Sequence, residues 1–562
     1  MRKSLIAGAV LVGALALAGQ AAACTGQAYN LNFYGASAQF QLFNQSAPTF
    51  LANQYGCNPV PTNVTSGNYG ITTGTGCTVA CSGQDTITIR VTSKASYDGV
   101  LSLSGEGKTE DKLGNGIAAN GTTNPNPYNF CNPAQTGWPF TGTYPSATSP
   151  SCCPGGTDAW TGTSCTDTCN YFYRVMYNTT AKDYACARVD VGLSDVNPTS
   201  FTQDLSPQTL PSAIYGGNAK VFSSDPVTIP AGFEVYNPIV DPFGFFASTD
   251  VKYSTCSSGI NAGQQCSAAT QCPTKYDACT AGKCVGGSNN GNACTSPANC
   301  PDANASCTAN TISNISKLQA ILIFSRQAFY WSDLGAGYSA SSVDSAYSST
   351  SAPIIACYRV AGSGTLATLY YAVMKNNGYG ISGALPTIDD GGIASGADDY
   401  VKFNDGTGAE MNCINSFKGA IGFADADQAL SMLPLSGIVA GKANSYPNVT
   451  ALSYGGIVPS RRALRNGEYD NFYAKEYMIV NPSNPDLSNP AVATMITNMY
   501  NALATPTGVN ATDRADFWAA FGETSTGENS GTVVNAEMHY MKGSDSVYPQ
   551  VETTGPTTPQ TP

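Results

Sequence analysis

A Gly-Ser-Gly turn with an arginine at its start lies near the middle of the chain, in the segment RVAGSGT at residues 359–365. It follows an apolar run, 352–358, that is typical of a buried strand, and it precedes apolar residues at helical spacing in 365–375. A helix start offers unpaired N–H groups and a partial positive charge, so it attracts anions. The planar guanidinium of Arg359 suits a tetrahedral oxyanion. Considered alone, the segment is explained equally well by an ordinary helix cap with Arg359 in a surface ion pair.

Residues 1–23 are typical of a secretory signal peptide. Arg2 and Lys3 precede an apolar stretch from Leu5 to Leu17, and three alanines, 21–23, form a cleavage site. The stretch is too short to anchor the chain across a bilayer. Cys24 follows at once, as in lipoproteins, but Ala21 stands where a lipobox usually has Leu, so lipidation is disfavoured. We therefore expect a protein of the periplasm, the cell surface or the extracellular space.

The cysteines predict disulfides rather than metal sites or catalysis. All 20 lie beyond residue 23, no CxxC pair occurs, and the single histidine is His539. Zinc sites of CxxC and His pairs therefore have no support, and an exported chain favours disulfides. His539 would be the sole histidine base of a Ser-His or Cys-His site, and we interpret it as a surface or packing residue. The sequence thus predicts a non-enzyme without cofactor or metal.

The charge balance excludes two classes of partner. Charged residues make up 11% of the chain and the formal net charge is −12. Such a surface repels nucleic acid and anionic membranes. An anionic ligand would have to be held by local dipoles and one or two basic groups.

Two cysteine-rich stretches interrupt the chain, the first at about 105–171. The second, 256–307, contains the spacing C-x9-C-x5-C-x6-C twice, with the cysteines Cys256, Cys266, Cys272 and Cys279 and then Cys284, Cys294, Cys300 and Cys307. The repeat predicts duplicated modules whose shape depends on disulfides, and the pairing cannot be deduced from spacing. The modules either contact a partner or serve as a passive, protease-resistant elaboration.

Elsewhere strand-like and helix-like segments alternate, which predicts an α/β fold. Strands are expected at 86–92, 184–195, 352–358, 419–425 and 473–480, and helices at 315–325 and 489–503. The Thr/Pro-rich tail, 548–562, is typical of disorder.

Four segments, in this order, resemble the phosphate-binding proteins of bacterial phosphate ABC transporters. They are YGASAQF (34–40), SYDGV (96–100), VDVGLSD (189–195) and RVAGSGT (359–365). The last fits that family's Arg-x-x-Gly-Ser-Gly-Thr motif at every interval. The resemblance covers most of the chain outside the cysteine-rich stretches and the tail.

The resemblance implies a two-lobed periplasmic binding protein fold with two disulfide-rich insertions. Lobe one would comprise 24–230 and 472–547, and lobe two 231–471. The chain would capture inorganic phosphate in the cleft and, as a monomer, deliver it to the membrane subunits of an ABC transporter. Two alternatives stay open: a ligand such as arsenate or another oxyanion, and a surface or matrix protein that acts through its disulfide-rich modules.

The resemblance also implies a ligand set drawn from both lobes. Its members are Gln39, Phe40 (through its backbone N–H), Ser96 and Asp195 from lobe one, and Arg359, Ser363, Gly364 and Thr365 from lobe two. Gln39 replaces a Thr of the family, and Ala361 replaces an Asp that pairs with the Arg. Asp195 can accept a hydrogen bond from the protonated oxygen of monohydrogen phosphate but not from sulfate, so it would select against sulfate. Considered alone, Asp195 is better explained as a turn-forming residue before residues 197–200, and it is the whole segment VDVGLSD that favours a ligand role.

Overall fold

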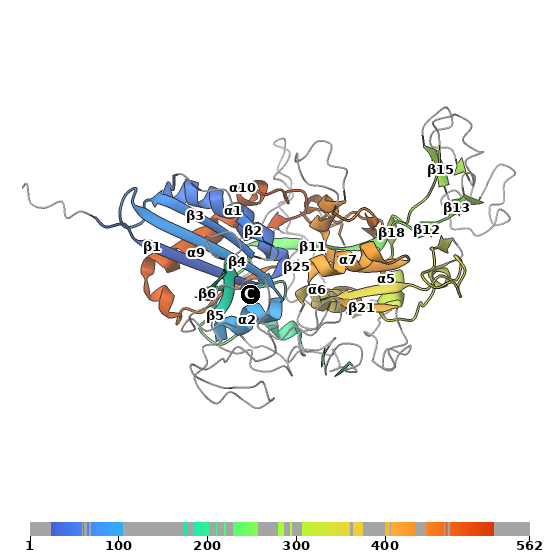
Figure 1. Cartoon of the computed structure of the whole chain (residues 1–562), viewed down its shortest axis with the longest axis horizontal. Helices are drawn as coiled ribbons and strands as arrows, with labels where there is room; N and C mark the ends of the chain where they lie inside the picture. Colours follow the sequence, from blue (N-terminus) through green and yellow to red (C-terminus); the bar gives the residue numbers. More distant parts are fainter. Residues whose placement is uncertain are drawn as a thin grey trace, which may run out of the picture.

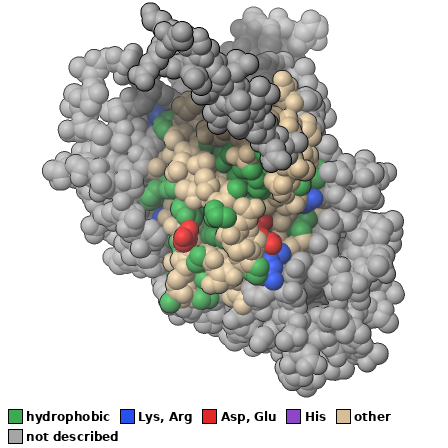
Figure 2. Space-filling view, turned by 90° about the vertical axis from the view of Figure 1, so that its left-hand side faces the viewer, with side chains coloured by type: hydrophobic (Ala, Val, Ile, Leu, Met, Phe, Trp, Pro, Cys, Tyr) green, Lys and Arg blue, Asp and Glu red, His purple; other side chains and the backbone are tan. Residues whose placement is uncertain are grey.

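The computed structural model describes most of residues 24–104, 173–201, 229–256, 306–374, 400–432 and 445–521, together with short strands between 209 and 294. The predicted signal peptide, His539, most of both cysteine-rich stretches and the tail lie outside the described residues. Among the described helices, none has the length and apolar character needed to cross a membrane. In the view of Figure 2 the described surface carries few charged side chains, in keeping with the composition.

The first of two seven-stranded sheets combines parallel and antiparallel pairs. In spatial order its strands are β10 (Glu234–Tyr236), β26 (Tyr477–Val480), β7 (Val191–Ser194), β1 (Ala28–Ala36), β4 (Asp85–Lys94), β3 (Tyr69–Cys77) and β2 (Val64–Ser66). β1 runs parallel to β4 and β7, and the remaining pairs are antiparallel. The carboxyl ends of β1, β4 and β7 therefore meet at one edge.

Helices cover both faces of this sheet because side chains of a strand alternate between faces. Phe33 of β1 packs in the core shared with α1 (Ser37–Tyr55) and α9 (Pro490–Leu503), whereas Tyr34 packs with α2 (Ser96–Ser104). The predicted helix 489–503 is confirmed, and it buries Val492, Met495, Ile496, Met499 and Leu503. Asn489 caps it by accepting a hydrogen bond from the N–H of Ala491.

The second sheet is built around one long strand, β11 (Ile239–Ser248), all of whose residues are buried. Its main order is β21 (Val401–Asn404), β20 (Ile355–Arg359), β22 (Ala420–Asp425), β11 and β23 (Val449–Ala451), and β25 (Tyr473–Lys475) and β27 (Ala519–Ala520) also pair with β11. β20 is parallel to β21 and β22. The sheet packs against α5 (Lys317–Phe324), against α6 (Gly364–Thr368) with its π-helical continuation η5 (Leu369–Met374), and against α7 (Thr407–Ser416).

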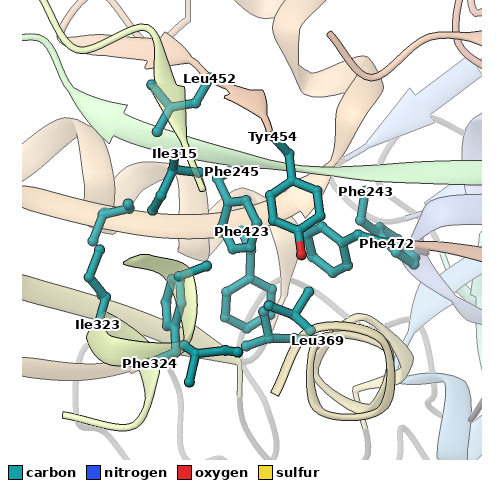
Figure 3. Close-up of a cluster of buried hydrophobic side chains, with 14 of the residues drawn as sticks. Phe243, Phe245, Ile315, Ile323, Phe324, Leu369, Phe423, Leu452, Tyr454 and Phe472 are labelled. Atoms are coloured by element: carbon teal, nitrogen blue, oxygen red, sulfur yellow. The ribbon is translucent and has the colours of Figure 1, made fainter. Parts of the chain in front are cut away.

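An aromatic core holds this second sheet to its helices. Phe245 of β11 stacks on Phe472 and Phe324, and Phe324 meets Phe423 edge to face (Figure 3). Ser316 starts α5 with a capping box, because its hydroxyl accepts from Gln319 N–H while the Gln319 side chain accepts from Ser316 N–H. The helix predicted at 315–325 and the strand predicted at 352–358 are thus both present.

Two neighbouring connections join the sheets. The chain passes from β10 in the first sheet into β11 in the second, and it returns from β25 in the second into β26 in the first (Figure 1). β11 and β25 are antiparallel, with Val240 opposite Lys475 and Asp241 opposite Ala474. The strand predicted at 473–480 is therefore two strands on different sheets with Glu476 between them. The strand predicted at 184–195 likewise divides into β6 (Tyr184–Arg188), which pairs with β5 (Tyr173–Tyr177), and β7.

Smaller elements complete the described parts. The short helices are α8 (Arg461–Arg465), α10 (Pro506–Asn510), η1 (Pro198–Phe201), η4 (Trp331–Leu334), η7 (Ala426–Ser431) and η8 (Pro485–Ser488). The short strand pairs are β8 (Thr209–Leu210) with β9 (Ala219–Lys220), β12 (Lys252–Tyr253) with β19 (Tyr338–Ser339), and β18 (Asn314–Ile315) with β24 (Ser453–Tyr454).

In both copies of the cysteine repeat, the first and fourth cysteine positions lie opposite each other on paired strands. β13 (Thr255–Cys256) pairs with β14 (Cys279–Thr280), which places the first and fourth cysteine positions of copy one opposite each other. β15 (Gly282–Val285) pairs with β17 (Ser306–Ala309), which does the same for Cys284 and Cys307, and with β16 (Ala293–Cys294). β13 and β15 stand away from both sheets in Figure 1.

Three disulfides lie among the described residues, and they join Cys24 to Cys81, Cys57 to Cys77 and Cys357 to Cys413. The Cys357–Cys413 disulfide joins β20 to α7. The Cys24 sulfur is bonded to Cys81, and a sulfur held in a disulfide cannot also form the thioether of a lipoprotein.

We expect loss of the Cys357–Cys413 bridge to lower the free energy of unfolding by about 4 kcal/mol, because it closes a loop with a sequence separation of 56. Urea denaturation of a Cys357→Ala/Cys413→Ala variant measures this. The Cys57→Ala/Cys77→Ala variant opens a loop with a separation of 20 and should lose about 3 kcal/mol. A larger loss for the shorter loop would contradict the loop-entropy explanation.

Candidate anion-binding site

The predicted site residues lie where strands end and helices begin. α1 starts directly after β1, α2 starts one residue after β4, and Asp195 follows β7. In the second sheet Arg359 is the last residue of β20, and Ser363 caps α6 by accepting a hydrogen bond from Leu366 N–H at 3.3 Å. The carboxyl ends of parallel strands are the usual ligand-binding edge of α/β sheets.

The start of α6 lies directly on residues of the first sheet. A Cβ added at Gly364 would be 2.6 Å from Ser96 Oγ, 2.7 Å from Asp195 Cβ and 2.8 Å from Asp195 Oδ2. The hydroxyl of Thr365 donates to Asp195 Oδ2 at 3.4 Å, and Asp195 N–H donates to Ser96 Oγ at 3.3 Å. The contacts thus join four predicted residues that follow strands of two different sheets, namely Ser96, Asp195, Gly364 and Thr365. Only glycine fits at position 364.

Arg359 is buried, with 2% of its surface exposed. Its guanidinium donates to Thr407 Oγ1 at 3.1 Å, and among the described residues its Nε has no partner and no carboxylate is close enough for an ion pair. Thr407 also donates to Asp425 Oδ2 at 3.3 Å and lies 3.1 Å from the hydroxyl of Ser37. A buried guanidinium is costly unless paired, so this group favours an oxyanion as its partner.

Gln39 and Phe40 lie in the first turn of α1, where backbone N–H groups have no acceptor within the helix. The Phe40 side chain packs in the core of the first sheet. The Gln39 amide donates to the carbonyl oxygens of Ser194 at 3.0 Å and Tyr477 at 3.1 Å. Both of its amide hydrogens are engaged, so the side chain retains an acceptor oxygen and no donor for an anion. These hydrogen bonds instead hold Ser194, which precedes Asp195, and Tyr477, which follows Glu476.

Asp195 is 1% exposed, and burial raises its pKa to about 6, against the lowering effects of Arg359 and of hydrogen bonds that include Ser96 and Thr365. Its Oδ1 has no donor among the described residues. An ionised carboxylate at this place can accept a hydrogen bond but cannot donate one. It therefore suits a ligand that still carries a proton.

Three further buried acids surround Asp195, and the sequence analysis missed them. Asp241, Asp425 and Glu476 are at most 3% exposed. Burial and mutual repulsion raise their pKa values well above the ordinary range. The signal that could have found them is an acidic residue within an apolar run, as in IVDPFGFF (239–246), AIGFAD (420–425) and YAKEYMIV (473–480).

Glu410 of α7, also missed, accepts hydrogen bonds from Phe423 N–H and the Asn404 amide. Burial raises its pKa to about 8, against the lowering effect of Arg359. Within the part of the chain that the structure describes, no three Asp, Glu, Cys or His side chains are placed to hold a metal ion. The site therefore offers hydroxyls, backbone N–H groups, one guanidinium and a set of carboxyl groups.

No protein-family model and no curated protein sequence matches the chain. Among solved structures, similarity is found to a protein assigned as the substrate-binding component of a phosphate ABC transporter from Clostridium perfringens, with bound phosphate. The identity is 11%, the match covers 57% of this chain and 76% of that one, and the TM-score is 0.28. A phosphate-binding protein from Stenotrophomonas maltophilia has 10% identity, coverages of 57% and 70%, and a TM-score of 0.29. PstS from Borrelia burgdorferi has 12% identity, coverages of 51% of this chain and 74% of that one, and a TM-score of 0.24.

These values describe only a distant fold similarity to proteins named for binding a substrate or phosphate. The chemistry of this chain has to be argued from its own residues.

Proposed function

We propose that the chain captures inorganic phosphate between two lobes and catalyses no reaction. The lobes would be those implied by the sequence, with one sheet in 24–230 and 472–547 and the other in 231–471. The β10–β11 and β25–β26 connections would serve as the hinge. Release to the membrane subunits of an ABC transporter, outside the cytoplasm, is part of the same proposal.

One observation carries the proposal: the start of α6 lies against Ser96 and Asp195, and Arg359 is buried with no ion-pair partner among the described residues. Hydroxyls and N–H groups from both sheets, together with a guanidinium, satisfy the oxygens of a tetrahedral anion from several sides. Binding is the chemistry that these groups support best.

Asp195 supports phosphate over sulfate. Monohydrogen phosphate can donate its proton to a carboxylate oxygen, whereas sulfate has no proton and would face that oxygen with like charge. Arsenate has the same shape and also carries a proton. Competition between the two anions decides which is bound more tightly, and tighter binding of arsenate would contradict phosphate as the ligand.

Calorimetric titration of the mature chain tests the proposal, and we expect binding of phosphate and none of sulfate. In Asp195→Asn the ratio of phosphate to sulfate affinity should fall at least about tenfold, because a hydrogen bond to a charged group contributes about 1.5–3 kcal/mol. Asp190→Asn is the matched control, since Asp190 is also buried but precedes β7 where Asp195 follows it. Unaltered discrimination in Asp195→Asn would remove Asp195 from the site.

A further inference from the structure

Two buried carboxyl groups lie on the connections between the sheets. Asp241 belongs to β11, and Glu476 joins β25 to β26. Glu476 N–H donates to the carbonyl oxygen of Ile239 at 2.9 Å, so Glu476 lies opposite Ile239. Side chains two residues apart on a strand share a face, so Asp241 lies on the same face as Ile239. Asp241 and Glu476 are therefore diagonal neighbours on one face of the connecting ribbon.

That face is directed at the candidate site. Glu476 is close enough to Asp195 for a hydrogen bond and also experiences the charges of Asp241 and Asp425. The negative charges of Asp425, Asp427 and Asp195 repel an ionised Asp241. The indole of Trp518 lies close enough to Asp241 for a hydrogen bond. The other charged groups around these acids are Arg359, which acts on Asp195 and Asp425, and Arg514, which pairs with Asp427 at 2.6 Å.

The four acids have too few counter-charges to be ionised together. Asp427 has Arg514, and Arg359 acts on Asp195 and Asp425, whereas the main influences on Asp241 and Glu476 are burial and the neighbouring carboxylates. The side-chain oxygens of Asp241 and Glu476 have few donors near them among the described residues: the indole of Trp518 lies close to Asp241, and Asp195, itself a carboxyl group, lies close to Glu476. Two carboxyl groups can hydrogen-bond to each other only when one of them is protonated. Neighbouring carboxyl groups in a dry interior therefore retain protons that separated, hydrated groups would lose.

A second observation ties these protons to an anion. Arg359 Nε is buried, has no partner among the described residues, and belongs to the guanidinium that acts on Asp195 and Asp425. An anion paired with this guanidinium adds negative charge beside the same carboxyl groups. That charge makes each of them hold a proton more tightly.

We propose that Asp241 and Glu476 form a proton-binding site that is loaded from solvent when the lobes close on the anion. The inference rests on the proposed function. Protonated Glu476 donates to Asp195, which leaves an ionised Asp195 oxygen to accept the proton of the ligand. Opening would separate Asp195 and Asp425 from the connections and return part of the bound protons to solvent, while Asp241 and Glu476 stay neighbours on the ribbon and retain a proton between them. Low pH thus favours capture and high pH favours release.

The test is calorimetry of phosphate binding in buffers of different ionisation enthalpy, from pH 5 to 8. Phosphate itself titrates in this range, so the relevant quantity is the difference between the wild type and the Asp241→Asn/Glu476→Gln variant, which keeps the side-chain shapes. We expect the wild type to take up more protons per phosphate bound, and its affinity to fall more steeply with pH. Each additional proton steepens the fall by about tenfold per pH unit.

Asp190→Asn is again the matched control. Burial raises the pKa of Asp190 to about 7, but its carboxylate accepts hydrogen bonds from Asn32 and Asn484, at the opposite end of β7 from Asp195. The Asp190→Asn variant should therefore take up as many protons per phosphate bound as the wild type. Equal uptake in the wild type and in Asp241→Asn/Glu476→Gln, at every pH, overturns the proton site while phosphate capture still stands.

If the wild type binds no phosphate at any pH, the proposed function fails, and a ligand-free measurement decides the proton site. Acids whose pKa is raised on folding bind more protons in the folded chain, so they stabilise it at low pH and this stabilisation is lost as pH rises above about 4. The free energy of unfolding should therefore fall less steeply with rising pH in Asp241→Asn/Glu476→Gln than in the wild type. Parallel curves of this free energy against pH overturn the proposal. Should that variant not fold, infrared difference spectra of the wild type between pH 5 and 8 must show buried protonated carboxyl groups, and their absence also overturns it.

Discussion

Arg359→Ala should abolish measurable phosphate binding. Removing one partner of a buried charge pair typically costs 3–5 kcal/mol, which corresponds to roughly a thousandfold loss of affinity. The Arg359 side chain is 2% exposed, and its hydrogen bond to Thr407 leaves Nε without a partner among the described residues. It is thus held in place with donor capacity still free. Calorimetric titration of the purified variant measures the loss.

Two variants bracket this result. Arg359→Lys keeps the charge but loses the planar fork, so its affinity should lie between the wild type and Arg359→Ala. Arg462→Ala removes an exposed arginine of α8 and should leave the isotherm unchanged. A phosphate isotherm that is unaltered in a folded Arg359→Ala chain would falsify the site assignment.

The fold was predictable where a repeating pattern and a local signal coincided. The apolar face of α9 recurs at helical spacing, and a polar capping residue precedes it. The run 473–480 shows the limit of this reasoning. Its eight residues form a plausible single strand, yet β25 and β26 pair with different sheets. An apolar pattern predicts that a strand is buried, but it does not predict which strand it pairs with. A chain that passes from one sheet to another therefore cannot be recognised from the pattern.

The site divides in the same way. Gly364 and Asp195 were predicted from short segments of fixed spacing, and the structure brings them together. Gln39 was expected to offer its amide to an anion, but that amide is engaged by two carbonyl groups of the main chain. Which atoms an amide meets depends on tertiary contacts. Asp241 and Glu476 belong to no recognisable segment, because their significance arises from register and from burial beside other acids.

The negative net charge and the buried acids set a common physical problem. A chain with a formal charge of −12 repels anions at long range, and its candidate site adds four more carboxyl groups at short range. Capture then requires that most of these carboxyl groups be neutral or hydrogen-bonded once the anion is enclosed. Helix starts, hydroxyls and one guanidinium can hold an anion only on that condition.

Gly364→Ala should weaken phosphate binding at least about a hundredfold. The new methyl group would lie 2.7 Å from Asp195 Cβ and 2.6 Å from Ser96 Oγ, distances at which real Cβ atoms are essentially never found. The Cβ of Asp195 is fixed by its main chain, so a side-chain rotation cannot relieve the contact. Because the clash arises only where α6 meets the first sheet, the variant should fold and fail to close. Calorimetry measures the affinity, and small-angle scattering should show a chain that does not become more compact with phosphate.

Gly406→Ala is the control that isolates contact from backbone effects. Gly406 precedes Thr407 at the start of α7, a Cβ there meets nothing within 4 Å among the described residues, and its φ of −151° is open to any residue. It therefore adds the same methyl group next to the same site without a clash, and its affinity should match the wild type. Equal losses in both variants would indicate general damage to helix starts. Wild-type affinity in Gly364→Ala would mean that phosphate binds without the contact between α6 and Asp195, and the closed site would have to be abandoned.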